Sequence, residues 1–146
     1  MFQSDENVIR WKLHLHSPRA RVYEFLNTDA GRAKFWAESA MENDGAIEFV
    51  FPNAWTWRGK ILDRVPQEKF SVIYFGNSIA TFELRDDGNG GTDVFLSHAK
   101  VPAQDRVEVI AGWASVLMQM KAAIDFEIDL RNHDKTRTWD EGFVEN

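Results

Sequence analysis

His98 is the polar side chain whose position best suits chemistry in an enclosed site. It follows Val94 and Leu96 at two-residue steps, so it shares one face of an expected strand with two apolar side chains. There it acts as a general acid and base near neutral pH, hydrogen-bonds to a ligand, or is a core histidine bonded to backbone. Tyr74, on another expected strand, offers a second hydrogen bond or simply places its hydroxyl at the rim.

Metal and covalent chemistry have weaker candidates. His14 and His16 share a strand face, but Lys12 lies beside them and a third ligand cannot be identified, so we expect no metal site. Nucleophile elbows and dinucleotide fingerprints are missing from the sequence, and the glycines of residues 87–91 join two expected strands as a hairpin turn. We therefore assign no catalytic residue, expect no cofactor, and leave open whether the chain is an enzyme.

Composition restricts the class of protein. A chain of 146 residues with 13% aromatic residues is typical of one globular domain, with a core at residues 8–131 and a tail at residues 132–146. The net charge of −6 disfavours nucleic acid and anionic membranes as partners. The chain has no cysteine, its start does not resemble a signal peptide, and we expect no apolar run near the roughly 20 residues of a membrane span. We expect a cytoplasmic protein with no membrane partner.

Hydrophobic periodicity predicts the elements that position these side chains. Residues 9–15 alternate as a half-buried strand, and Ser17-Pro18 then starts a short helix, which a second helical piece ending near Phe35-Trp36 follows. Further strands, about six in total, are expected at residues 47–51, 55–65, 70–74, 82–84 and 94–98. Gly59 lies inside one of them and indicates a bend, a bulge or a close approach to the backbone.

One long helix is expected at residues 104–131. Its apolar stripe comprises Val109, Trp113, Val116, Leu117, Met120, Ile124 and Ile128. The carboxylates Asp125, Glu127 and Asp129 are expected on its outer face as solvated charges. The polar tail that follows contains Trp139 and Phe143, so it is either a loose terminus or docked on the body or on a second subunit.

Several short motifs in this order resemble a known superfamily. They are Ser17-Pro18, Phe25-Leu26, Phe35-Trp36, residues 57–61, Val65-Pro66, residues 81–84, residues 91–96 and Gly112-Trp113. Their order and spacing resemble the START/Bet v I-like (SRPBCC) superfamily, and most of all the family of homologues of the activator of heat-shock-protein-90 ATPase. The resemblance implies an α+β helix-grip fold, in which a curved antiparallel sheet wraps around a long C-terminal helix and two short helices follow the first strand.

Such a fold predicts a cavity between the sheet and the long helix, lined by aromatic side chains and a few polar groups. The residues expected to bind a ligand there are Trp11, Phe49, Trp57, Tyr74, Phe82, Leu96, His98, Trp113, Leu117 and Met120. The alternative is that these residues form a filled core. The expected function is binding of an apolar or aromatic small molecule. The alternatives are a cyclase-, dehydratase- or hydrolase-like enzyme acting on such a ligand, and a co-chaperone or interaction module, with a homodimer as a possible assembly.

Overall fold

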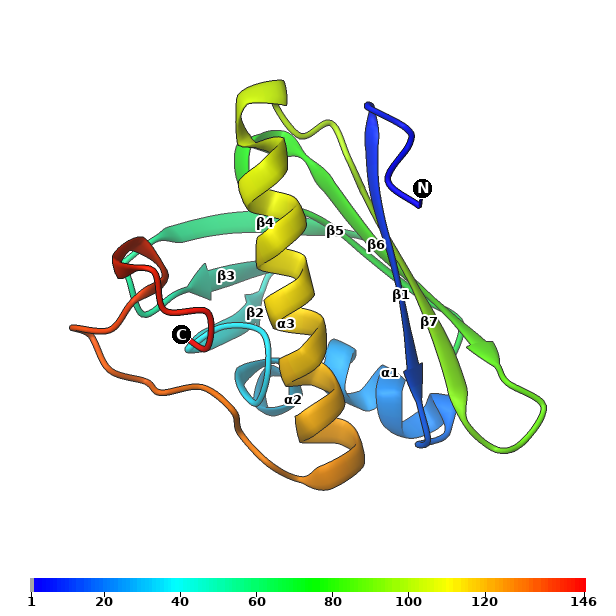
Figure 1. Ribbon diagram of the computed structural model, residues 1–146. Coiled ribbons are helices and arrows are strands. Elements are labelled where there is room, and N and C mark those ends of the chain that lie inside the picture. Colours follow the sequence, from blue (N-terminus) through cyan, green and yellow to red (C-terminus); the bar gives the residue numbers. More distant parts are fainter. Residues whose placement is uncertain (1) are drawn as a thin grey trace.

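A computed structural model describes residues 2–146 as one curved antiparallel sheet packed around one long helix (Figure 1). The seven strands are ordered β1-β7-β6-β5-β4-β3-β2. They are β1 (Val8–Leu15), β2 (Ser39–Asn43), β3 (Ala46–Val50), β4 (Thr56–Val65), β5 (Lys69–Ile73), β6 (Ile79–Asp86) and β7 (Thr92–Ala99). The helices are α1 (Arg19–Asn27), α2 (Asp29–Ala33) and α3 (Arg106–Phe126), with 3₁₀ turns at Phe75–Asn77, Ala103–Asp105 and Trp139–Glu141.

The α+β helix-grip fold expected from the sequence is confirmed, with α1 and α2 following the first strand and α3 crossing the sheet. The strand count of about six was one too low, because the edge strand β2 was not anticipated. Only Ala40 is buried in β2, while Met41 and Asn43 are exposed. A short edge strand with one buried residue lacks the alternation by which a strand is recognised in a sequence.

Where the sheet faces α3, buried side chains alternate strictly with less buried ones, as β7 shows. In β7, the side chains of Thr92, Val94, Leu96 and His98 are buried, while those between them are half-buried. Residues paired across β6 and β7 share these faces, so that Phe82 lies opposite Leu96. His98 therefore lies on the apolar face that its spacing predicted.

Gly59 marks the place where β4 and β5 come unusually close. A Cβ atom at this position would clash with the backbone carbonyl of Ile73. The pairing of β4 with β5 also shifts register between Ile61 and Asp63. A glycine is therefore needed for close backbone approach next to a bulge, as its place inside an expected strand suggested.

Helix α3 is shorter than the predicted helix at residues 104–131. It begins at Arg106 after a 3₁₀ turn and ends at Phe126, because Glu127 adopts a left-handed conformation with φ of 55°. Ile128, predicted to lie on the apolar stripe, is instead 53% exposed beyond the helix end. The helix and the turn before it, Ala103–Phe126, are long and apolar enough to cross a membrane by length and composition, contrary to our expectation. In this fold α3 is the core helix, with Trp113 and other apolar side chains buried against the sheet.

Asp125 is also not the solvated charge that we expected. Its side chain is 1% exposed and accepts hydrogen bonds from the backbone N–H of His16 (2.9 Å) and of Ser17 (3.1 Å). The hydroxyl of Ser17 and the ammonium of Lys121 also bond to it. Burial opposes ionisation, but these bonds outweigh it and lower the pKa of Asp125. The carboxylate thus ties the end of α3 to the β1–α1 connection.

The tail is docked on the body, the second of the two expected arrangements. It turns back along α3 (Figure 1), and the hydroxyl of Ser115 on α3 donates a hydrogen bond to the carbonyl of Val144. At its start, the guanidinium of Arg131 is buried and donates to the carbonyls of Ala33 (2.6 Å) and Ala37 (2.8 Å). The tail therefore covers one side of the space between α3 and the sheet.

Candidate functional site

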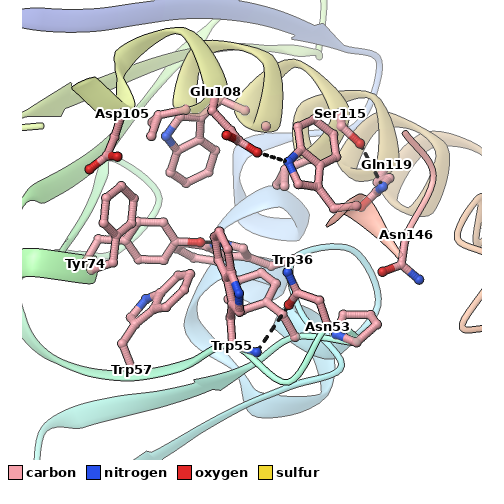
Figure 2. A pocket seen from close by; sticks show the side chains of 18 residues that line it. Trp36, Asn53, Trp55, Trp57, Tyr74, Asp105, Glu108, Ser115, Gln119 and Asn146 are labelled. Carbon is pink, nitrogen blue, oxygen red and sulfur yellow. Dashed lines mark hydrogen bonds between the residues drawn. The ribbon is translucent and has the colours of Figure 1, made fainter. Parts of the chain in front are cut away.

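A cavity of about 300 Å³ lies between the sheet and the N-terminal half of α3 (Figure 2). Eight of the residues that line it are aromatic: Trp36, Phe51, Trp55, Trp57, Tyr74, Phe75, Trp113 and Trp139. They include five of the six tryptophans in the sequence. This partly open space with aromatic walls has the size and lining of a small-molecule site at the lower end of the usual volume range.

Six separate segments bring these rings together, and Phe51 and Trp55 come from the connection between β3 and β4. Trp36 follows α2, Trp57 lies on β4, and Tyr74 begins the turn that leads to β6. Trp113 comes from the middle of α3 and Trp139 from the tail. The site therefore depends on long-range packing and does not exist in any one element of the chain.

Trp36 and Tyr74 form the floor of the cavity. The indole Nε1–H of Trp36 donates a 2.9 Å hydrogen bond to the hydroxyl oxygen of Tyr74, and both side chains are buried. Burial raises the pKa of Tyr74, so its hydroxyl remains protonated at physiological pH. The ring of Trp36 also packs against Phe49, Phe82 and Trp113. This contact network fixes the floor before any ligand binds.

His98 does not line the cavity but contacts Trp113, an α3 residue of the cavity wall. Its Nδ1 accepts a 2.9 Å hydrogen bond from the indole of Trp113, so the proton of the neutral ring is on Nε2. That nitrogen lies 2.7 Å from the hydroxyl of Ser78, which in turn donates to the carbonyl of Phe75. Burial lowers the pKa of His98 to about 4, so the ring is neutral at physiological pH. These bonds make His98 a positioning residue for Trp113 and Phe75.

Trp57 provides a polar group without a partner. Its indole Nε1 is buried, and it has no hydrogen-bond partner in the part of the chain that the structure describes. A buried donor left unpaired costs about 1–3 kcal/mol. Because Trp57 lines the cavity, a bound molecule with an acceptor could recover part of this free energy after a small shift of the ring.

The mouth of the cavity is polar and acidic. Asp105 and Glu108 line it at the start of α3, and Figure 2 shows both carboxylates above the rings of Trp55 and Trp57. Oε1 of Glu108 accepts a 2.8 Å hydrogen bond from the indole of Trp139, which fixes the tail residue over the opening. Asn53 lies across the mouth and its side-chain amide bonds to Asp140 at 3.3 Å.

The structure separates the ten residues expected to bind a ligand into two groups. Trp57, Tyr74 and Trp113 line the cavity. The others do not line it and belong to the packed core or its margin: Trp11, Phe49, Phe82, Leu96, His98, Leu117 and Met120. Both alternatives left open by the sequence therefore apply, because a filled core underlies a smaller cavity.

Trp11 shows why a shared strand face does not guarantee a shared site. Its ring is half-buried, and its Nε1 donates to the carbonyl of Ile110 at 3.1 Å. Leu117 and Met120 lie one and two turns beyond Trp113 on α3, where the helix already packs on the sheet. Gly112, one residue before Trp113, lines the cavity, and a Cβ atom there would meet nothing within 4 Å.

Sequence reasoning missed five aromatic wall residues: Trp36, Phe51, Trp55, Phe75 and Trp139. Phe51 and Trp55 were placed in expected strands, but β3 ends at Val50 and β4 begins at Thr56, so both lie in the connection between them. Trp36, Phe75 and Trp139 lie in connections or in the tail, where no periodicity assigns a side chain to a face. The concentration of tryptophans was the available signal. Residues 2–146 contain no group of three or more side chains that could together hold a metal ion.

Comparisons with known proteins place the chain in a family. Residues 16–125 match the sequence model described as Activator of Hsp90 ATPase homolog 1-like protein. No curated protein is significantly similar in sequence to the chain.

Among solved structures, the Aha1 dimer from Colwellia psychrerythraea is 20% identical, with a TM-score of 0.72 over 82% of this chain and 96% of that one. A protein from Chromobacterium violaceum is 23% identical, with a TM-score of 0.64 over 83% and 99% of the two chains. CalU16 from Micromonospora echinospora is 22% identical, with a TM-score of 0.66 over 80% and 73%. At such identities the similarity establishes the fold alone.

Proposed function

The chain belongs to the Activator of Hsp90 ATPase homolog 1-like protein family, and on this premise we propose that it binds an apolar or aromatic small molecule between the sheet and α3. The observation that carries the proposal is the cavity of about 300 Å³ with its eight aromatic side chains. Such a lining leaves apolar surface facing an open space in the free protein. Covering this surface with a ligand contributes roughly 25 cal/mol per Å² before entropic costs.

Preorganised walls favour binding over collapse of the cavity. The rings of Trp36 and Trp113 are each held by a hydrogen bond to another buried side chain, Tyr74 and His98 respectively. A ligand therefore does not have to order these side chains, which keeps the entropic cost of binding low. The enzyme alternative required His98 to face the ligand and to titrate near neutral pH. The observed packing of His98 supports a positioning role instead.

Gly112 allows a direct test of the cavity. A Cβ atom there would meet nothing within 4 Å, and Gly112 lines the cavity. We expect Gly112→Phe to fill the space while leaving the fold intact, because phenylalanine has a higher helix propensity than glycine. Titration with the neutral fluorescent compound N-phenyl-1-naphthylamine should give saturable one-to-one binding to the native protein. The affinity should fall at least tenfold in Gly112→Phe.

Ala111→Phe is the matched control, because Ala111 is exposed on the same helix and does not line the cavity. It adds the same ring one residue away and should bind the probe as the native protein does. Equal affinity in all three proteins, with unchanged melting temperatures, would refute the proposed site. Native mass spectrometry of the freshly purified protein should in addition show any apolar passenger at one-to-one stoichiometry.

We infer that the protein acts in the cytoplasm as a single domain. A homodimer is the assembly to test. The Colwellia psychrerythraea relative is described as a dimer, which supports testing the same state here. The exposed Phe143 and Val144 of the docked tail are the apolar surface to examine. Light scattering would give the molar masses of the native protein and of a variant lacking residues 133–146. Comparing them shows whether the native protein is a dimer and whether the dimer needs the tail.

A further inference from the structure

The charges around the cavity select one class among apolar and aromatic ligands. None of the eighteen residues that line it is lysine, arginine or histidine, whereas Asp105 and Glu108 both line its mouth. We propose that the ligand is an organic cation, an amine or quaternary ammonium compound whose apolar part fits among the rings. This inference rests on the proposed function and specifies its ligand.

Neither carboxylate is neutralised by the protein. In the described part of the chain, residues 2–146, no ion pair involves Asp105, Glu108 or the neighbouring Asp140. The cation nearest in sequence, Arg106, donates its guanidinium N–H groups to backbone carbonyls of the N-terminal segment, including Asp5 at 2.8 Å. The N-terminus of α3 contributes about half a positive charge through its dipole, and the two carboxylates outweigh it.

The walls contribute to the same preference. Tryptophan provides the strongest ring face for a cation, and five of the eight aromatic wall residues are tryptophans. Figure 2 shows the rings of Trp55 and Trp57 on the side of the cavity opposite the carboxylates of Asp105 and Glu108. A cationic head group at the mouth would thus lie between aromatic rings and negative charge. The net charge of −6 would also favour the approach of a cation over that of an anion.

A pair of compounds with the same shape and different charge tests the inference. Benzyltrimethylammonium and neopentylbenzene differ in one central atom, nitrogen or carbon, and 3-phenylpropionate supplies an anion of similar size. Displacement of N-phenyl-1-naphthylamine measures all three affinities, and the indole N–H signals in NMR spectra report on the cavity rings. At low ionic strength we expect the cation to bind about tenfold to a hundredfold more tightly than its neutral isostere.

Charge-removing variants locate the source of the preference. Asp105→Asn together with Glu108→Gln should bring the cation close to its neutral isostere in affinity while the isostere binds as before. Glutamine at 108 can still accept the hydrogen bond from Trp139. The control Glu48→Gln with Glu68→Gln removes the same charge from exposed positions outside the cavity and should leave the preference unchanged.

The outcomes separate this inference from the proposed function. Equal binding of cation and isostere, or tighter binding of 3-phenylpropionate, would overturn the cation inference and leave the apolar site standing. A preference that survives the Asp105→Asn and Glu108→Gln changes would also overturn the assignment to these carboxylates. If N-phenyl-1-naphthylamine and all three compounds fail to bind, the proposed function itself is wrong.

Discussion

The indole Nε1–H of Trp113 donates a 2.9 Å hydrogen bond to Nδ1 of His98, so a fully buried histidine fixes the orientation of a cavity ring. The other nitrogen of His98 bonds to Ser78, which caps the turn containing Phe75. Two residues of the cavity wall are thus held through one imidazole. Its loss should affect ligand binding through geometry and not through contact.

Burial of neutral His98 predicts a specific loss of stability in mild acid. The pKa of His98 is lowered to about 4 by burial, whereas the unfolded chain has a value near 6.5. The stabilisation is therefore complete above about pH 6.5 and is lost as pH falls towards about 4, by about 3 kcal/mol in total. Urea unfolding at pH values between 4 and 7.5 measures the slope, and NMR titration of the ring gives the pKa directly.

His98→Asn provides the comparison for this prediction. It should lower the free energy of unfolding at pH 7 by about 2–4 kcal/mol, because the side chains of Trp113 and Ser78 then lack a full partner in the core. Between pH 4 and 6.5, the free energy of unfolding of the variant should depend less steeply on pH than that of the native protein. An imidazole signal of His98 that titrates near pH 6.5 in the native protein would contradict the buried, neutral state.

Two glycines should respond in opposite directions to alanine. At Gly59 a Cβ would clash with the backbone carbonyl of Ile73, so Gly59→Ala should destabilise the protein by about 1–3 kcal/mol or more. At Gly112, on α3, a Cβ meets open space, so Gly112→Ala should stabilise it by about 1 kcal/mol through helix propensity. Thermal and urea unfolding of both variants test the pair. Similar effects at the two positions would show that the β4–β5 approach is not as close as described.

The backbone architecture could be predicted from the sequence because it depends on periodicity. The alternation that ends in His98 and the helical stripe around Trp113 each identify a buried face without knowledge of the fold. The resemblance to the family then ordered these elements around a central helix. The edge strand β2 and the left-handed end of α3 at Glu127 were missed, because neither leaves a periodic pattern.

The cavity could be predicted only in part, because its walls come largely from connections. Trp57, Tyr74 and Trp113 lie at ends or middles of regular elements, and the sequence identified them as candidates. Trp36 and Trp139 lie in connecting or terminal segments whose positions depend on tertiary contacts. How far a side chain lies behind the cavity wall also depends on tertiary packing. The sequence therefore did not distinguish core residues from wall residues.

Asp125 illustrates a polar residue whose role only tertiary structure reveals, and it predicts a large effect. Asp125→Asn replaces one acceptor oxygen by an NH₂ group beside the backbone N–H groups of His16 and Ser17. We expect a loss of about 2–4 kcal/mol in the free energy of unfolding, since bonds to a buried charge are lost. Glu127→Gln, at an exposed carboxylate two residues away, should change it by less than about 0.5 kcal/mol. Equal effects would show that Asp125 is solvated after all.

The tail is fastened by a contact that should weaken in alkaline solution. Nε2 of His133 lies 2.7 Å from a carboxylate oxygen of Asp129, and Nδ1 lies 2.6 Å from one of Glu38. Both carboxylates raise the pKa of His133, Asp129 first, because the charged ring donates to each of them. This stabilisation is fully present below about pH 6.5 and is lost as pH rises through the raised pKa. The partners are partly exposed, so the effect should be within about 1 kcal/mol.

Trypsin cleavage after the exposed Lys135 and Arg137 measures this fastening, because both bonds become more accessible when the tail detaches. The ratio of the cleavage rate of His133→Gln to that of the native protein removes the pH dependence of trypsin itself. We expect this ratio to exceed one at pH 6 and to approach one by about pH 9, as native His133 loses its proton. A ratio that stays constant across this range would show that the charge of His133 does not hold the tail. Since Trp139 covers the cavity from this tail, a ratio that changes with pH also predicts weaker ligand binding in alkaline solution.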